Sequence, residues 1–167
     1  GLVERGIGLW VETIQVPARR LETSFSTEDV RWGIAESRST QLNPFHSYFG
    51  SMRDRIHDAE DGGLPATVQD VSMGAVISLD RHIWFEVPEN ACFIRSPQGW
   101  RHCPDAERDW FEERMLPVYQ VGVDYLVDNP LTTGCLSIRK LDVDFPAGSQ
   151  VQTSSPAWWQ SLAHLEA

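Results

Sequence analysis

Two basic side chains, Arg53 and His57, have the types and spacing to act together on one ligand. They stand four residues apart in the segment 44–60, whose apolar residues recur at helical spacing. Side chains at positions i and i+4 of an α-helix are neighbours on one face. The pair is therefore a candidate for binding an anion or a carboxylate. The alternative is the solvent-exposed edge of an amphipathic helix.

The same predicted helix carries His46 and His57, but a shared metal ion is excluded for that helix alone. Eleven residues at 1.5 Å per residue place the two rings about 16 Å apart along the axis. No histidine or cysteine pair has zinc-ligand spacing. P-loop, GxSxG, HExxH and EF-hand motifs are absent. We therefore expect no metal site and no cofactor, although distant segments could still assemble a site.

A second candidate lies in the loop 100–105, where His102 and Cys103 precede a predicted helix. A cysteine at a helix start is favoured as the reactive thiolate, and a histidine can serve as its base. However, neighbours in sequence rarely point at each other, and no signature of a cysteine enzyme surrounds Cys103. A packed loop cysteine is the alternative interpretation.

Carboxylates form an acidic ridge on the second predicted helix, residues 104–116. The net charge of the whole chain is −10. This charge argues against nucleic acid and against an anionic membrane surface, because both are bound through basic faces. Charge complementarity favours a basic protein partner instead, and the alternative is a solvated helix face. The ridge consists of Asp105, Glu107, Asp109, Glu112 and Glu113.

A tryptophan in a predicted strand is a further candidate for binding. Trp84 points to the face opposite Ile83 and Phe85, because side chains alternate along a strand. If no helix covers that face, Trp84 marks a binding surface. If a helix covers it, the residue is structural.

The elements that position these residues predict an α+β fold. Apolar alternation over 71–79, 83–87 and 92–95, with short turns between, predicts an antiparallel β-meander. Helices are expected at 44–60 and 104–116, and two or three helices should pack on one face of the sheet. Residues 117–127 fit a strand or a helix continued past a proline, and we favour the helix.

The two ends of the chain add weaker elements. Residues 7–16 alternate and predict a strand, as do residues 131–145, with a phase shift near Arg139 and Lys140. Ser155 and Pro156 have the types that cap and start a helix, which predicts a short terminal helix there. No linker-like segment divides the chain, so we expect residues 1–167 to form a single domain.

The cysteines indicate a reducing compartment. They number three, an odd count, and no CxxC occurs, which favours reduced thiols in the cytoplasm. No run of about 18 apolar residues exists, so no membrane-spanning helix is expected. The oligomeric state does not follow from the sequence.

The function predicted from these features is that of a non-catalytic acidic protein that docks a basic protein partner, as an inhibitor or a toxin-immunity protein does. The alternative is a small enzyme or ligand-binding protein with an apolar pocket between sheet and helices. Whether the chain catalyses a reaction is left open by the sequence. The predicted binding residues are Asp105, Asp109, Glu112, Glu113, Trp84, Arg53 and His57.

Overall fold

The computed structural model describes residues 8, 11–23, 52–66, 87–100, 103–143 and 153–167. It divides into two compact units, Gly1–Gly63 and Leu64–Ala167. We describe each unit by itself, and the expectation of a single domain over residues 1–167 stays a prediction. In the part of the chain covered by these ranges, no helix is long and apolar enough to cross a membrane.

The N-terminal unit contains short 3₁₀ helices rather than the α-helix predicted over 44–60. They are η2 (Ala18–Arg20), η4 (Met52–Arg55) and η5 (His57–Gly62). The prediction is wrong for residues 52–60, and residues 44–51 lie outside the described ranges. Aspartate is a poor helix former, and Asp54 and Asp58 lie within these turns. Residues 11–17 form no strand, contrary to the strand predicted over 7–16.

The second unit contains an antiparallel sheet of four strands, which confirms the α+β fold. The strands are β1 (Cys92–Gln98), β2 (Cys135–Ile138), β3 (Leu141–Asp142) and β4 (Thr153–Trp159). The order is β1-β4-β2, and β3 also pairs with β4. β1 is the third strand of the predicted meander. Its first two strands, 71–79 and 83–87, lie outside the described residues except for Val87.

A continuous helical run covers the segment that sequence patterns left ambiguous. It comprises α1 (Asp105–Trp110), a π-helical turn η6 (Phe111–Met115) and α2 (Leu116–Asp128), so the helix favoured for 117–127 is confirmed. The backbone N–H of Leu116 bonds to the carbonyl of Phe111, five residues earlier. Pro117 has no N–H to donate, and the wider π turn just before it accommodates that gap.

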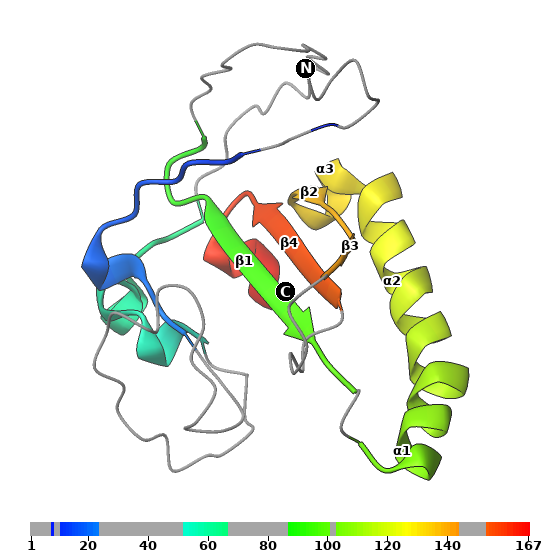
Figure 1. Cartoon of the computed structure of the whole chain (residues 1–167). Helices are drawn as coiled ribbons and strands as arrows, with labels where there is room; N and C mark the ends of the chain where they lie inside the picture. The colour runs from blue at the N-terminus through cyan, green and yellow to red at the C-terminus, as the bar shows by residue number, and fades with distance from the viewer. Residues whose placement is uncertain (1–7, 9–10, 24–51, 67–86, 101–102, 144–152) are drawn as a thin grey trace. The chain divides into compact units, whose positions relative to one another are not determined.

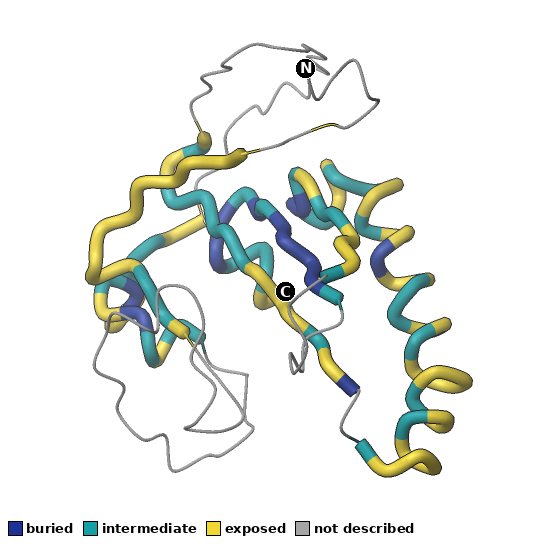
Figure 2. Tube along the Cα trace, in the orientation of Figure 1, coloured by how far each residue is buried: buried dark blue, intermediate teal, exposed yellow. Residues whose placement is uncertain are grey.

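The helices pack on one face of the sheet, as predicted. Cys135, Ala157 and Trp159 are buried at the centre of this core face, and Leu126 of α2 and Leu165 of α4 (Leu162–Glu166) pack against them. Figure 1 shows α2 running beside the sheet and α4 lying behind it, and Figure 2 shows that buried residues of this unit gather on β4 and on the turn that leads into α4.

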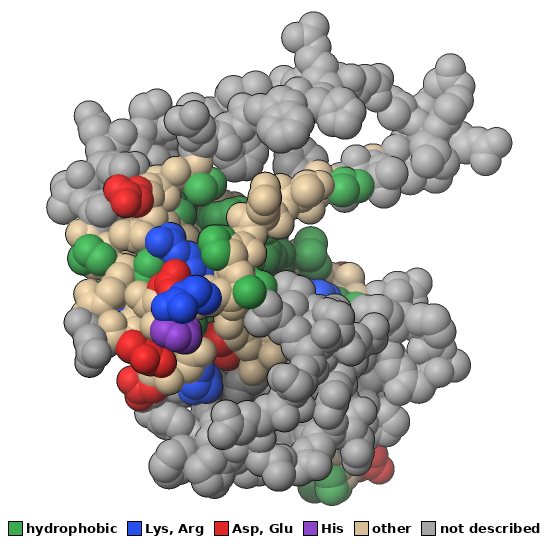
Figure 3. Space-filling view, turned by 90° about the vertical axis from the view of Figure 1, so that its left-hand side faces the viewer, with side chains coloured by type: hydrophobic (Ala, Val, Ile, Leu, Met, Phe, Trp, Pro, Cys, Tyr) green, Lys and Arg blue, Asp and Glu red, His purple; other side chains and the backbone are tan. Residues whose placement is uncertain are grey.

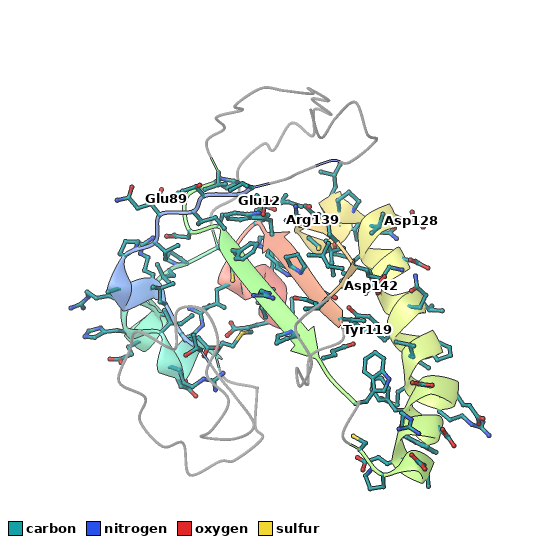
Figure 4. The ribbon with its side chains drawn as sticks, viewed as in Figure 1. Glu12, Glu89, Tyr119, Asp128, Arg139 and Asp142 are labelled. Carbon is teal, nitrogen blue, oxygen red and sulfur yellow. The ribbon has the colours of Figure 1, made fainter. Side chains whose placement is uncertain are left out.

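The polar contact between α2 and the sheet comes from Tyr119, whose side chain lies between the two in Figure 4. Its hydroxyl forms a hydrogen bond with the hydroxyl of Ser155. Ser155 alternates with Ala157 and Trp159 along β4, so it belongs to the same core face. The buried Ser155 is thus the hydrogen-bond partner of the half-buried Tyr119 hydroxyl.

A short terminal helix is present, as predicted, but it starts at Leu162 rather than at Ser155 and Pro156, because both of these residues lie inside β4. A proline in a central strand removes a ladder donor. Strand β2 ends at Ile138 and β3 starts at Leu141, and between them the N–H of Arg139 bonds to the Pro156 carbonyl at 3.1 Å. The break predicted near Arg139 and Lys140 therefore lies opposite Pro156, which has no backbone N–H to donate to a neighbouring strand.

Gly134 connects the start of β2 to the last helix. It follows the short helix α3 (Pro130–Thr133) and has a left-handed φ of 74°. A Cβ placed on it would lie 2.5 Å from Cδ2 of His164. Its carbonyl accepts the N–H of Gln160 at 2.8 Å. Both the backbone conformation and the space beside it thus require glycine.

Replacing Gly134 with alanine should destabilise the chain by about 1–3 kcal/mol from backbone strain, and further from the clash with His164. Gly122→Ala is the matched control. Nothing lies within 4 Å of a Cβ there, and alanine in a helix interior should stabilise by about 0.5–1 kcal/mol. Urea unfolding of both variants measures the difference. Equal effects in the two variants would contradict this account of Gly134.

Candidate functional site

A charged cluster ties η2 to η5 in the N-terminal unit. Arg19 donates from Nε to Oδ1 of Asp58 at 2.7 Å, and Arg20 donates from Nε to Oδ2 at 3.3 Å. The space-filling view shows side chains of both charges and a histidine gathered on this face (Figure 3). The Arg19 hydrogen bond lowers the pKa of Asp58, which is opposed by partial desolvation and assisted by Arg20.

His57 belongs to this cluster through its Nδ1 atom. Arg19 Nη2 lies 2.9 Å from His57 Nδ1. An arginine can only donate, so Nδ1 is the acceptor and the proton of the neutral ring is on Nε2. Neither nitrogen of His57 then offers a lone pair to a metal ion while the contact with Arg19 persists.

The structure gives Arg53 and His57 different partners. Arg53 donates from Nη1 to the carbonyl of Gly63 at 2.8 Å, just beyond the end of η5. It also lines a depression of about 340 Å³ together with Asp54, Ala59, Glu60 and Gly62. His57 is not among the lining residues. These contacts direct Arg53 and His57 to different groups and do not form the shared anion site predicted for the pair.

The acidic ridge is exposed, although some of its carboxylates also make contacts within the unit. Asp105, Glu107, Asp109, Glu112 and Glu113 are all exposed, and Asp105 accepts from Arg108 at 2.6 Å. Glu112 accepts the indole N–H of Trp100 at 2.7 Å. The Trp100 ring lies 5.0 Å from the ring of Phe111, so this carboxylate holds the preceding loop against the π turn. Trp84, the remaining predicted site residue, lies outside the described residues.

The thiol chemistry considered for Cys103 stays a prediction, because its partner is not described. Cys103 is partly buried, and its backbone N–H donates to the Trp100 carbonyl at 3.1 Å. His102 lies outside the described residues. Cys135 is the buried thiol of the core, and desolvation raises its pKa, which favours the unreactive protonated form. All three cysteines are thiols rather than disulfides.

Sequence reasoning missed the face of the sheet opposite the core face, which we call the open face because Arg95 on it is exposed. It carries Phe93, Arg95, Ser154, Pro156 and Trp158, because these positions alternate with the core residues. Ser154 and Pro156 are buried, and the two aromatic rings are half-buried. The rings of Phe93 and Trp158 are paired across β1 and β4 at 4.9 Å. Arg95 donates from Nε to the hydroxyl of Ser154 at 3.1 Å.

The open face was hidden by the helix predicted from Ser155. A strand would place Trp158 and Trp159 on opposite faces, and that alternation was the available signal. The contacts of Tyr119, Leu126 and Leu165 with the sheet all lie on the core face. An aromatic pair beside a cation on the other face can hold an apolar or planar ligand.

The chain matches the family of haem-containing dehydratases over residues 2–167 and belongs to that family. Among its relatives, the phenylacetaldoxime dehydratase of Bacillus sp. (strain OxB-1) is 28% identical over 163 residues, covering 96% of this chain and 46% of the relative. The aliphatic aldoxime dehydratase of Rhodococcus globerulus is 29% identical over 174 residues, with the same coverage. That of Pseudomonas chlororaphis is also 29% identical, over 47% of its length.

The chain thus spans about half the length of the curated relatives it matches. Membership of the family contradicts the predicted function. The prediction of a non-catalytic acidic protein of the inhibitor or immunity type was wrong, because it rested on missing motifs and charge. The alternative of a small enzyme or ligand-binding protein is closer to the family match.

The family description names a haem group, which the sequence did not lead us to expect, and three of the described side chains that could ligate it are already engaged or buried. An axial ligand is a histidine, cysteine, methionine or tyrosine beside an apolar slot. The lone pair of His57 is engaged by Arg19, and the thiol of Cys135 is buried in the core, where desolvation raises its pKa. His164 bonds through Nδ1 to Ser161 at 2.8 Å and packs beside Gly134, away from the open face.

The remaining places in the described residues where haem or a metal ion could be held do not yield an axial ligand either. The depression beside Arg53 is lined by none of the four ligand types. Within the ranges that the structure describes, no group of three or more His, Cys, Asp or Glu could hold a metal ion. His46, His82 and His102 lie outside those ranges. We therefore assign no axial ligand and derive no reaction step through haem.

Replacing Asp58 with asparagine should flatten the loss of stability in acid. The folded-state pKa of Asp58 lies below its usual value of 3.8, so the carboxylate stabilises the fold above that pH, and the contribution is lost as the pH falls through the lower folded-state pKa. The midpoint of thermal unfolding between pH 7 and pH 2 measures this. Asp109→Asn removes an exposed carboxylate as the control, and an identical acid profile in both variants would refute the role of the Arg19 contact.

Proposed function

We propose that this chain acts in a haem-dependent dehydratase whose substrate is an aldoxime. The observation that supports the proposal is the family match over residues 2–167, together with the names of the relatives, which are aldoxime dehydratases. The chain spans about half the length of those relatives, so their names do not establish its reaction, and the reaction is our proposal.

Dehydration of an aldoxime converts R–CH=N–OH into the nitrile R–C≡N and water. The N–O bond and the C–H bond break, a third C–N bond forms, and the carbon-bound proton and the hydroxyl group leave together as water. No external oxidant or reductant is consumed. The site must hold the R group and exclude bulk water, while an acid and a base act at the oxime.

The open face suits the first of these tasks. Phe93 and Trp158 offer a paired aromatic surface that can pack against an alkyl or aryl group, since apolar contact is the recognition such a group permits. Arg95 is held beside them by Ser154 and supplies the one charged side chain of this face among its described residues. We propose that this surface forms one wall of the site.

The activity is tested by product analysis. The purified chain is incubated with haem and with phenylacetaldoxime or an aliphatic aldoxime, with the iron ferric in one set and ferrous in the other, and nitrile is measured by gas chromatography. We expect nitrile to form in proportion to the haem bound and to be absent without haem. A haem-loaded chain that yields no nitrile from either substrate in either iron state would overturn the proposal.

The role of the open face is tested by Trp158→Ala. Loss of the aromatic wall should raise the KM for the aldoxime about tenfold or more, with a smaller effect on kcat, because the contact serves binding before chemistry. Trp110→Ala, which removes an exposed tryptophan of α1, is the matched control and should leave KM unchanged. Trp158→Phe should restore most of the affinity. If Trp158→Ala and Trp110→Ala behave alike, the open face is not the substrate wall.

Two further features of the protein remain proposals. The net charge of −10 and the exposed Asp109 and Glu113 support a basic protein partner, and no contact tests it. A cytoplasmic location is supported by the three thiols. Nucleic acid and membranes are not expected as partners, for the same reason of charge.

A further inference from the structure

The open face carries a cation whose charge is not used within the described part of the chain. Arg95 lies two residues after Phe93 on β1, so both side chains project from the open face. Arg95 is exposed, and its Nε donates to the hydroxyl of Ser154 at 3.1 Å. Among the residues that the structure describes, no aspartate or glutamate forms an ion pair with Arg95. Its charge is therefore available to a ligand.

The partner of Arg95 is unusual for a cation of this acidic chain. The net charge is −10, so carboxylates are plentiful. Several other described cations pair with them, namely Arg19, Arg20, Arg55, Arg108 and Lys140. Arg95 is held instead by Ser154, a neutral side chain that is 1% exposed. A buried hydroxyl thus fixes the guanidinium group without neutralising it.

The aromatic pair and the guanidinium group lie at different ends of the open face. Phe93 faces Trp158 across the two strands, and Ser154 lies four residues before Trp158 on β4. At about 3.4 Å per residue, Ser154 is about 14 Å along the strand from Trp158. Arg95 starts opposite Pro156, which is halfway, and reaches Ser154. Its charge therefore lies about 7–14 Å along the strand from the aromatic pair.

We propose that the open face binds a ligand in which an aromatic ring and a carboxylate are joined by a short chain. The ring packs on Phe93 and Trp158, whose tilted rings offer the edges and faces that aromatic groups prefer. The carboxylate meets Arg95, because a planar guanidinium group matches a planar carboxylate and donates two hydrogen bonds to it.

Arg95 is then a specificity-determining residue of the site. Among aldoximes it selects those whose R group carries both an aromatic ring and an acidic group. This selection rests on the proposed function, whereas the binding of the anion does not. An exposed ion pair changes affinity by only about two- to fivefold. The ring therefore supplies most of the affinity, and the charge decides between ligands that share the ring.

Binding of 6-phenylhexanoate to the purified 167-residue chain tests the site without any reaction. This probe has a ring and a carboxylate joined by methylene groups, and it has no oxime. Ligand-observed NMR titration measures its Kd. We expect 6-phenylhexanoate to bind about two- to fivefold more tightly than the neutral 6-phenylhexanamide at low salt. Hexanoate, which lacks the ring, should bind about tenfold more weakly or worse. Equal Kd values for the carboxylate and the amide would overturn the proposal.

Two arginine variants assign the preference to Arg95. Arg95→Gln should abolish the preference for the carboxylate and leave the Kd of the amide unchanged. Arg114→Gln is the matched control, since it removes an exposed arginine of the π turn, outside the open face, and it should keep the preference. Circular dichroism should show the same fold in both variants. A preference that survives Arg95→Gln, or that Arg114→Gln abolishes equally, counts against the site.

Product analysis separates this site from the proposed reaction. If 6-phenylhexanoate binds with the expected preference while no aldoxime yields nitrile, the anion site stands and the proposed reaction fails. If nitrile forms while Arg95→Gln leaves the preference intact, the reaction stands and the role of Arg95 is overturned.

Discussion

Strand β4 is the element on which the arrangement of the C-terminal unit depends. It pairs with β1 along seven residues on one side and with β2 and β3 on the other. Its core face buries Ala157 and Trp159 beneath α2 and α4, and the hydroxyl groups of Ser155 and Tyr119 share a hydrogen bond. The same strand therefore fixes both helices and, through Trp158 and Ser154, the residues of the open face.

Residues of a strand that packs on one face must alternate between apolar and other types, and this explains why part of the fold could be predicted from the sequence. Apolar alternation correctly predicted β1, and the phase shift at Arg139 and Lys140 correctly predicted a break, because both express side-chain packing along the chain. The helix through Pro117 was also predictable. It survives because a π turn absorbs the missing hydrogen bond, and that turn is not visible in the pattern of residues.

The failures came where tertiary contacts override local preference. Ser155 and Pro156 have the residue types of a helix start, yet β4 is paired on both sides and holds them in a strand. Pro156 has no backbone N–H, and it lies opposite the gap between β2 and β3. Arg53 and His57 read as neighbours on one helix, yet the 3₁₀ turns direct them to Gly63 and Arg19. Because the C-terminal helix was predicted to start too early, the open face of the sheet could not be predicted. That face is the strongest candidate site of this unit.

Function was the least predictable feature, because the absence of short motifs excludes few classes of protein. Family membership supplies what the motifs do not, and the proposed substrate wall depends on the aromatic pair of Phe93 and Trp158. The measurement that tests this account most directly is a titration of the purified chain with haem, followed by its Soret absorption. The account predicts a band that saturates and shifts when an aldoxime is added. A titration without a saturable band, or a band that no aldoxime perturbs, would contradict it.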